Sequence, residues 1–195
     1  MRLDGPRQRR ELWLPLLGVH QLENAATAIA VIDALVEGGT RVSEEAIAAG
    51  LRGVSWLGRL EVLRERPLLV VDGAHNGDSA RRLCQALRDY FQFRRVILVS
   101  GASQDKTVDR MARELAPLAA LVIATRSRHP RAGDAAAVAA AYVAAGAATE
   151  TAPSVAAALE RALSVAAPED LVCVMGSLFV VAEAREHILR LEAAV

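Results

Sequence analysis

One stretch decides the fold: VVDGAHN at residues 70–76, where an apolar run stops at an acid, a glycine and a histidine before a helix-like segment begins. In a parallel α/β sheet, ligands bind beyond the carboxyl ends of the strands, and a glycine there lets a ligand approach the backbone closely. We therefore expect Asp72 and His75 to stand at the binding edge of a sheet. The alternative, that Asp72 or Asn76 only caps the next helix, is equally compatible with the local chemistry.

The chain that follows alternates between strand and helix patterns. It predicts strands at 96–99, 121–124 and 171–175, a weak strand near 149–151, and helices over about 79–90, 108–115, 135–145 and 179–191, with another after residue 154. Residues 60–63 predict a half-exposed strand that folds back beside the buried run at 68–71. This order indicates an α/β, Rossmann-like fold with a mostly parallel sheet and helices on both faces.

The amino-terminal part follows a different pattern. A broadly apolar helix ends at Gly38-Gly39, and Ser43 caps a shorter helix that carries two glutamates in its first turn. We expect this short helical segment, residues 1–52, to belong to a preceding unit. Residues 53–195 should form the α/β domain.

Composition excludes several classes of function. The chain has 195 residues, of which 23 are basic and 23 acidic, so no overall field favours nucleic acid or an anionic membrane. No apolar leader segment follows Met1, and no stretch reaches roughly eighteen uninterrupted apolar residues. The two cysteines, Cys84 and Cys173, lie within apolar patterns, which is typical of a reducing compartment. We expect a soluble, cytoplasmic protein.

Two further loops follow predicted strands. GASQDKT at residues 101–107 ends in Lys-Thr, but it lacks the second glycine of a phosphate-binding loop and is one residue short. Lys106 is then either a point charge for a carboxylate or phosphate, or an exposed lysine at a helix start. RSRHPRA at residues 126–132 is either an anion site or, the interpretation we favour, a solvated loop.

Other chemistry finds little support. There is no G-x-G-x-x-G dinucleotide fingerprint, no cysteine or histidine pair has metal-ligand spacing, and the serines lack the G-x-S-x-G elbow. We predict no metal site and assign no catalytic residue. Considered alone, Arg59 is typical of an exposed arginine before a strand, and an ion pair with Glu61 on an exposed strand face would contribute little to stability.

Four motifs occur in a defined order: GVHQLENAA at 18–26, WLGRLEV at 56–62, DGAHN at 72–76 and VMGSL at 174–178. Each is weak alone, but their joint occurrence around an α/β pattern is specific. Together they resemble the folylpolyglutamate synthase/dihydrofolate synthase branch of the Mur ligase family. The resemblance extends from about residue 18 to the end of the chain.

The resemblance implies an ATP-dependent ligase that adds glutamate to folate. In that family ATP converts a carboxylate to an acyl phosphate, which the incoming amine then attacks. Four positions are similar to the family's nucleotide contacts: Asn24 near the adenine, Arg59 at the domain junction, Asp72 at the ribose and His75 beside the nucleotide. Lys106, and less closely Ser177, match positions near the carboxylate of the incoming amino acid.

The sequence also departs from the family pattern. Proline is common where Leu57 and Gly77 stand, and a second acid where Thr107 stands. The chain lacks a Gly-Lys-Ser/Thr phosphate loop, a folate-binding amino-terminal half and a Mg²⁺ site of the family's kind. The resemblance therefore implies a carboxy-terminal domain with the last helices of an amino-terminal ATPase domain, a monomeric fragment that is inactive alone. Mg²⁺ would be bound mainly by the missing half.

Two other functions stay open. One is a non-catalytic nucleotide-binding or partner module with the same fold, and the other is a Mur-type ligase domain that acts on peptidoglycan precursors. For the ligase, we expect Asp72→Ala to raise the ATP requirement of the intact enzyme by removing a contact of about 1 kcal/mol, with little loss of folding.

Overall fold

The computed structural model describes residues 1–4, 9–104 and 107–193. The chain divides into two compact units, Met1–Leu57 and Gly58–Val195. Each unit has its own hydrophobic core.

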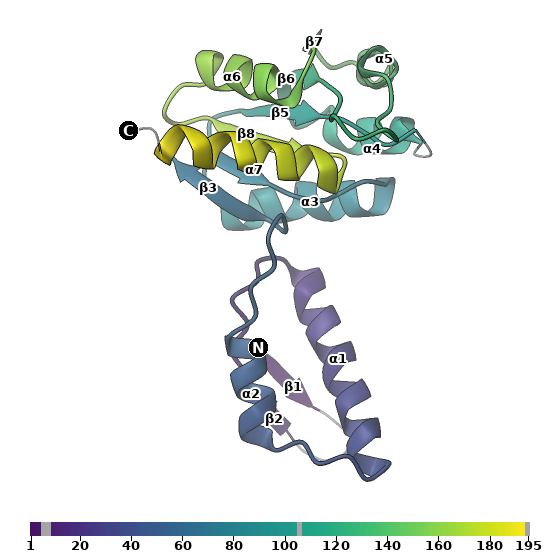
Figure 1. Ribbon diagram of the computed structural model, residues 1–195, viewed down its shortest axis with the longest axis vertical. Helices are drawn as coiled ribbons and strands as arrows, with labels where there is room; N and C mark the ends of the chain where they lie inside the picture. The colour runs from purple at the N-terminus through teal and green to yellow at the C-terminus, as the bar shows by residue number, and fades with distance from the viewer. Residues whose placement is uncertain (5–8, 105–106, 194–195) are drawn as a thin grey trace. The chain divides into compact units, whose positions relative to one another are not determined.

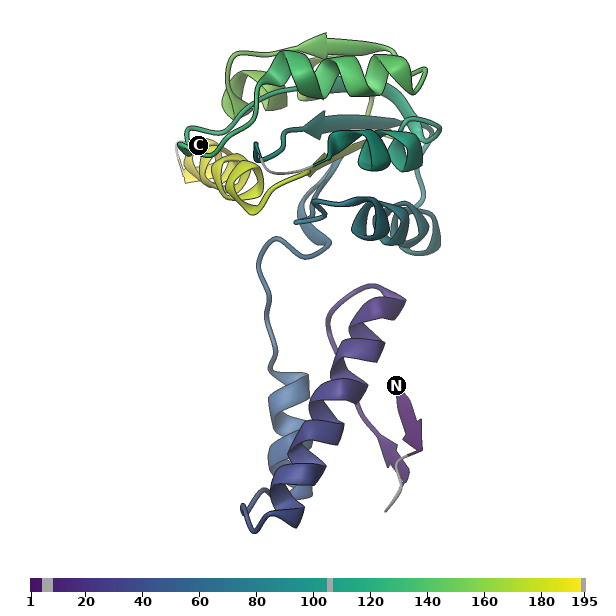
Figure 2. The same ribbon diagram turned by 90° about the vertical axis from the view of Figure 1, so that its right-hand side faces the viewer.

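The smaller unit combines a two-stranded sheet with two helices. Strand β1 (Arg2–Asp4) pairs antiparallel with β2 (Arg9–Glu11), and α1 (Val19–Glu37) lies beside α2 (Glu44–Arg52) (Figure 1, Figure 2). The sequence pattern predicts both helices, including the cap at Ser43, whose hydroxyl accepts a hydrogen bond from the Ala46 N–H at 3.2 Å. It does not predict the strands, which are too short to show an alternating pattern.

A buried arginine joins the parts of this unit. The Arg10 side chain from β2 donates to both carboxylate oxygens of Asp33 on α1, at 2.8 and 2.9 Å, and to both of Glu44, at 2.8 Å each. The hydrogen bonds that Arg10 donates to Glu44 and then to Asp33 raise the pKa of Arg10 above its ordinary value. The guanidinium thus stays charged inside the unit, where an unpaired charge would be costly.

The larger unit is built on a six-stranded sheet in the order β3-β4-β8-β5-β6-β7. Its five parallel strands are β4 (Leu68–Val71), β8 (Leu171–Met175), β5 (Val96–Ser100), β6 (Ala119–Ala124) and β7 (Thr149–Thr151). The edge strand β3 (Glu61–Glu65) pairs antiparallel with β4. The predicted mostly parallel sheet is therefore confirmed.

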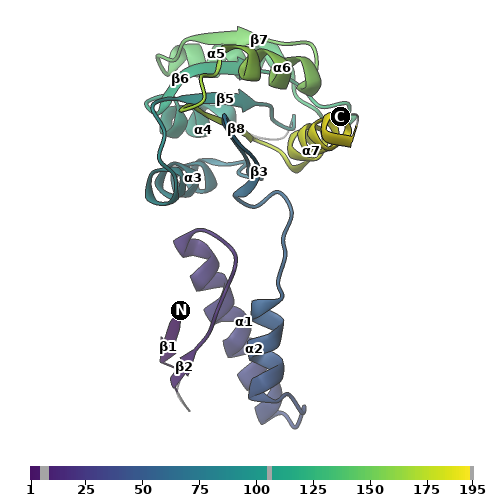
Figure 3. The same cartoon turned by 90° about the vertical axis from the view of Figure 1, so that its left-hand side faces the viewer.

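Helices cover both faces of this sheet, as predicted. They are α3 (Gly77–Tyr90), α4 (Val108–Leu115), α5 (Ala135–Ala144), α6 (Val155–Val165) and α7 (Leu178–Ala193). Helix α3 packs on α4 and α4 on α5, whereas α6 packs on α7. Figure 3 shows α3 and α4 on one side of the sheet and α7 on the other.

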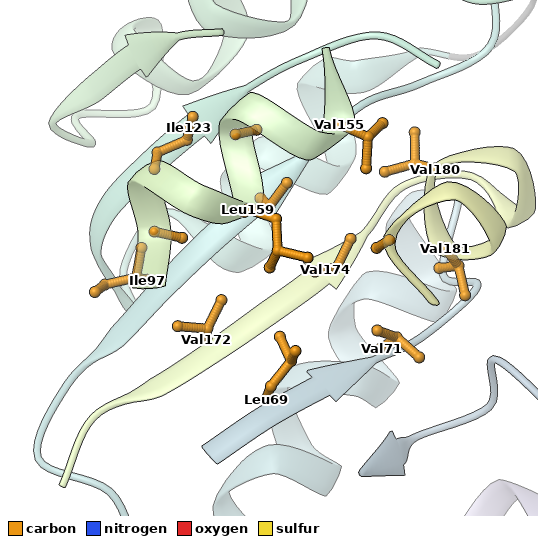
Figure 4. Close-up of a cluster of buried hydrophobic side chains, with 14 of the residues drawn as sticks. Leu69, Val71, Ile97, Ile123, Val155, Leu159, Val172, Val174, Val180 and Val181 are labelled. Carbon is orange, nitrogen blue, oxygen red and sulfur yellow. The ribbon is translucent and has the colours of Figure 1, made fainter. Parts of the chain in front are cut away.

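One core of the larger unit lies between the central strands and helices α6 and α7 (Figure 4). Val172 and Val174 project from β8 toward Leu159 of α6, and all three side chains are fully buried. Because both faces of the central strands are covered, these strands are apolar along their whole length rather than alternating. That is why the apolar runs in the sequence locate them.

A buried acid fixes the amino-terminal edge of the sheet. Asp170 accepts hydrogen bonds from the Arg94 Nε at 3.1 Å, the Arg95 Nε at 2.8 Å and the Ala167 N–H at 2.8 Å. Burial raises the pKa of Asp170, but the hydrogen bonds from Ala167 and the two guanidinium groups outweigh it and lower the pKa to about 2. The start of β5 is thereby tied to the start of β8.

We predict that Leu159→Ala lowers the free energy of unfolding by about 2–5 kcal/mol, because it leaves a cavity between α6 and the sheet. Urea denaturation followed by far-UV circular dichroism measures the change. The control is Leu189→Ala on α7, whose side chain is 49% exposed; it should change stability by less than about 1 kcal/mol. Equal losses for the two variants would contradict this description of the core.

The lowered pKa of Asp170 predicts a specific response to acid. The stability that its ionised form contributes is present above about pH 4, the range of an unfolded aspartate, and is lost as the pH falls through about 2. Asp170→Asn should therefore be less stable than the parent chain at neutral pH, with the difference narrowing between about pH 4 and pH 2. Urea unfolding at a series of pH values measures it. A difference that stays constant, or one matched by the exposed-site control Asp89→Asn, would contradict the assignment.

Candidate functional site

Three strand-end loops meet at the carboxyl edge of the parallel strands. Asp72 follows β4, Gly101 follows β5 and Gly176 follows β8. The Gly176 N–H donates to the Ala74 carbonyl at 2.8 Å, and the Gly101 N–H donates to the Met175 carbonyl at 3.3 Å. These bonds hold the loops against one another at the edge where ligands bind in such sheets.

The Asp72 carboxylate lies at the centre of this edge and is only 8% exposed. Its Oδ1 accepts from the Ala74 N–H at 2.8 Å, and its Oδ2 accepts from the Leu60 N–H at 2.9 Å. Leu60 belongs to the loop before β3 and has a positive φ of 45°, which is unfavourable for leucine. Asp72 therefore joins the loop before β3 to the loop after β4.

The capping interpretation applies to Asn76 and not to Asp72. The Asn76 Oδ1 accepts from the Ser79 N–H at 2.9 Å, and the Ser79 Oγ accepts from the Asn76 N–H at 3.1 Å, a complete capping box. Asn76 thus begins α3 two residues before the predicted start. Asp72 instead joins the loops on either side of it at the edge.

Arg59 lies directly over the backbone of Gly73. A Cβ atom on Gly73 would come within 3.0 Å of the Arg59 Nη1 and 2.6 Å of the Leu178 Cδ2, so a larger residue there would displace the ends of both side chains. The Gly73 N–H also donates to the Gly58 carbonyl at 2.8 Å. Arg59 forms no ion pair with any residue in the ranges 1–4, 9–104 and 107–193.

Glu61, which the sequence offered as a partner for Arg59, has other partners. Its carboxylate accepts from the Arg185 Nε of α7 at 2.9 and 3.0 Å, and from the Gly58 N–H at 2.7 Å. This ion pair connects β3 to α7. No sequence pattern predicts this pair, because 124 residues separate the two side chains.

His75 points back toward the loop that carries it. Its Nδ1 lies 2.9 Å from the Gly73 carbonyl oxygen. Since a carbonyl only accepts, we assign the proton to Nδ1, which leaves Nε2 as an acceptor. A half-buried imidazole in this state can accept a proton or a hydrogen bond at the binding edge.

The other predicted site residues have different positions. Ser177 is buried at the start of α7, where its Oγ accepts from the Phe179 N–H at 3.2 Å. Asn24 is exposed on α1 of the smaller unit, and its amide donates to the Gln21 Oε1 at 3.1 Å. Lys106 lies outside the described residues. The structure thus brings Arg59, Asp72, His75 and Ser177 to one edge of the larger unit.

The three arginines of the loop at residues 126–132 are exposed, which agrees with a solvated loop, and the loop also contacts α7. The Arg128 N–H donates to the Glu183 Oε1 at 2.6 Å, and its guanidinium donates to Glu186 at 2.7 Å. The His129 ring stacks on Phe179 with centroids 3.6 Å apart. Phe179 was absent from the sequence-based site, and its place two residues after Ser177 was the signal that could have included it.

Neither cysteine is an available nucleophile. Burial, with the charge of Asp72 adding to it, raises the pKa of the Cys173 thiol well above its ordinary value, and burial raises the pKa of Cys84 to about 11. Across the described ranges, no three His, Cys, Asp or Glu side chains are grouped so as to hold a metal ion. In the same ranges, no helix is long and apolar enough to cross a membrane.

The fold and this edge define a class: an α/β ligand-binding domain whose parallel strands present their ligand at their carboxyl ends. Comparison with known proteins narrows the class. Residues 58–178 match the family model described as "Mur ligase, glutamate ligase domain", and the chain belongs to that family.

Individual relatives confirm the resemblance to folylpolyglutamate synthases. The chain is 41% identical over 178 residues to a probable bifunctional folylpolyglutamate synthase/dihydropteroate synthase of Halobacterium salinarum, a match that covers 91% of this chain and 21% of that protein. A dihydrofolate synthase/folylpolyglutamate synthase of Mycobacterium tuberculosis is 37% identical over 126 residues, which are 64% of this chain and 26% of that protein. The chain thus spans about a fifth to a quarter of these relatives.

A solved structure gives the same result. The Mycobacterium tuberculosis folylpolyglutamate synthase complexed with ADP superposes with a TM-score of 0.84 and 28% identity, over 96% of this chain and 46% of that one. The likeness therefore includes both units of the chain and less than half of the synthase.

The contacts of Asp72 change what we expect of Asp72→Ala. The substitution leaves the N–H groups of Leu60 and Ala74 without acceptors in a buried place, so we predict a loss of about 2 kcal/mol or more of folding stability. Asp72→Asn, which keeps one acceptor oxygen, should lose less. Urea denaturation of both variants measures this. The control Asp78→Ala removes an exposed acid and should change stability by no more than about 1 kcal/mol; a similarly small effect of Asp72→Ala would contradict the role.

Proposed function

We propose that this chain is the carboxy-terminal part of an ATP-dependent ligase that adds glutamate to folate, and that residues 1–52 are the last helices of its amino-terminal ATPase domain. The observation that carries the proposal is the Arg59 guanidinium over Gly73, beside the buried Asp72 carboxylate. This pair lies in a chain that is similar to a synthase whose structure holds ADP.

The residues of the larger unit suit the ribose and phosphates of ATP. Asp72 accepts hydrogen bonds from the N–H groups of Leu60 and Ala74, which hold its carboxylate at the binding edge, and carboxylate oxygens at such an edge suit the hydroxyls of a ribose. Arg59 offers the forked donor geometry that binds phosphate oxygens, and no described carboxylate occupies it. His75 presents its Nε2 beside them. In the smaller unit, the exposed amide of Asn24 is suited to hydrogen bonds with the adenine.

The amino acid side of the site has different chemistry. The buried hydroxyl of Ser177 accepts from the Phe179 N–H and keeps its own proton to donate to a carboxylate. Lys106 would supply a positive charge for the same glutamate. The role of these residues is to orient the incoming amine and exclude water from the activated carboxylate.

The remaining requirements belong to the rest of the protein. ATP supplies the phosphoryl group that activates the folate carboxylate, and Mg²⁺ would be held mainly by the amino-terminal ATPase domain. Folate and glutamate are the small-molecule substrates of this proposal. We further propose that the enzyme is monomeric and cytoplasmic, and that it binds neither nucleic acid nor a membrane.

A domain exchange tests this function. Alone, the 195-residue chain should release no ADP in the presence of ATP, folate and glutamate, since its sequence has no phosphate-binding loop. Fused behind the amino-terminal part of the Mycobacterium tuberculosis synthase, in place of the matching domain, it should give ADP release that requires both folate and glutamate. Arg59→Gln in the fusion should raise the KM for ATP about tenfold or more. Arg88→Gln, an exposed arginine at the far end of α3, is the matched control.

The isolated chain and the fusion have opposite expected results. Turnover by the isolated chain, or a folded fusion whose ADP release ignores glutamate, would contradict the proposal. A fusion that binds ATP but lacks turnover would favour the non-catalytic nucleotide-binding module.

A further inference from the structure

A second arginine-rich feature lies next to the binding edge. A pocket of about 890 Å³ opens between α3 and α4, and we call it the α3–α4 pocket. Residues 75–78 and Arg81 line it from the side of α3, and Thr107, Arg110, Arg113 and Glu114 line it from the side of α4. It shares His75 and Asn76 with the edge described above, but none of its three arginines belongs to the motifs that resemble the ligase family.

The pocket has an excess of positive charge. Asp78 is already engaged by Arg81 at 2.7 Å and by Arg82 at 3.0 Å. Arg110 and Arg113 form no ion pair with any residue in the described part of the chain. Both arginines line the pocket, and among its described lining residues the acids are Asp78 and Glu114. Unpaired arginines in a concave site favour a carboxylate or phosphate ligand.

Gly77 is what allows Arg110 to stand there. A Cβ atom at position 77 would lie 2.8 Å from the Arg110 Cβ, which is closer than real side chains approach. The absence of a Cβ atom at position 77 and the position of Arg110 are thus two parts of one arrangement.

We propose that the α3–α4 pocket is an anion-binding site in which Arg110 and Arg113 hold a carboxylate or phosphate group of a small molecule. Because His75 and Asn76 line both the pocket and the edge, the anion is a group of a ligand bound at the edge or a separate ion beside it. Only the identity of the anion rests on the proposed function: glutamate would supply the carboxylates, and ATP the phosphates.

Binding to the 195-residue chain tests the proposal without any catalytic activity. L-glutamate, ATP and inorganic phosphate are titrated separately at low ionic strength, and backbone amide chemical shifts are followed by NMR. We expect at least one probe to give saturable shifts at Gly77, Thr107 and Arg110. Saturation by glutamate alone would assign a carboxylate subsite, and saturation by ATP or phosphate would assign a phosphate subsite.

Three variants separate a specific site from general attraction. Arg110→Gln should weaken binding about tenfold or more, through loss of a charge-assisted hydrogen bond. Gly77→Ala should also weaken it, because the added Cβ displaces Arg110. Arg88→Gln removes the same charge at the other end of α3 and should leave the dissociation constant unchanged. The exposed arginines are not part of the core, so both arginine variants should fold, as circular dichroism would show.

Several results would overturn the proposal. One is the absence of saturable shifts in the pocket with all three probes. Another is binding that Arg110→Gln does not weaken, or that Arg88→Gln weakens equally, since either would show only general attraction to a basic surface. Because none of these measurements needs turnover, failure of the anion site and failure of the ligase function are distinguishable.

Discussion

Two hydrogen bonds to one buried carboxylate hold the binding edge together. Asp72 accepts from Leu60 on one side and from Ala74 on the other, so the loop before β3 and the loop after β4 share a single anchor. Leu60 adopts a left-handed conformation that costs roughly 1 kcal/mol, and its bond to Asp72 stabilises it. Arg59 directly precedes Leu60, so its place over Gly73 depends on the same anchor.

Charged side chains are paired at one edge of the sheet, and two arginines near the other are unpaired in the part of the chain that the structure describes. At the amino-terminal edge, the buried Asp170 is neutralised by Arg94 and Arg95, which is an arrangement that ties strands together. Near the carboxyl-terminal edge, Arg59 and Arg110 have no carboxylate partner within the described ranges. At the amino-terminal edge, the buried acid is thus paired with arginines of the same unit. Near the carboxyl-terminal edge, the positive charge of Arg59 and Arg110 favours an anionic ligand.

The sequence predicted most of the architecture because its strands are buried on both faces and appear as apolar runs. The end of an apolar run marks the end of a strand. Asp72 and His75, which follow the run at residues 68–71, therefore located the binding edge. The sequence could not predict the bond between Asp72 and Leu60, the pair of Glu61 with Arg185, or the packing of His129 on Phe179. These contacts join segments far apart in the chain, and only the folded sheet brings them together. The pair Gly77 and Arg110 is of the same kind.

The direction of β3 has a consequence for how such proteins are assembled from parts. Because β3 runs antiparallel to β4, the chain enters the larger unit at the carboxyl edge of the parallel strands rather than at the opposite end. The join between the two units, at Leu57 and Gly58, is thus only one residue from Arg59. A gene fusion or recombination event at this join would carry Arg59 and its place over Gly73 along with the larger unit. The exchanged segment would therefore be inherited with this part of its ligand edge intact.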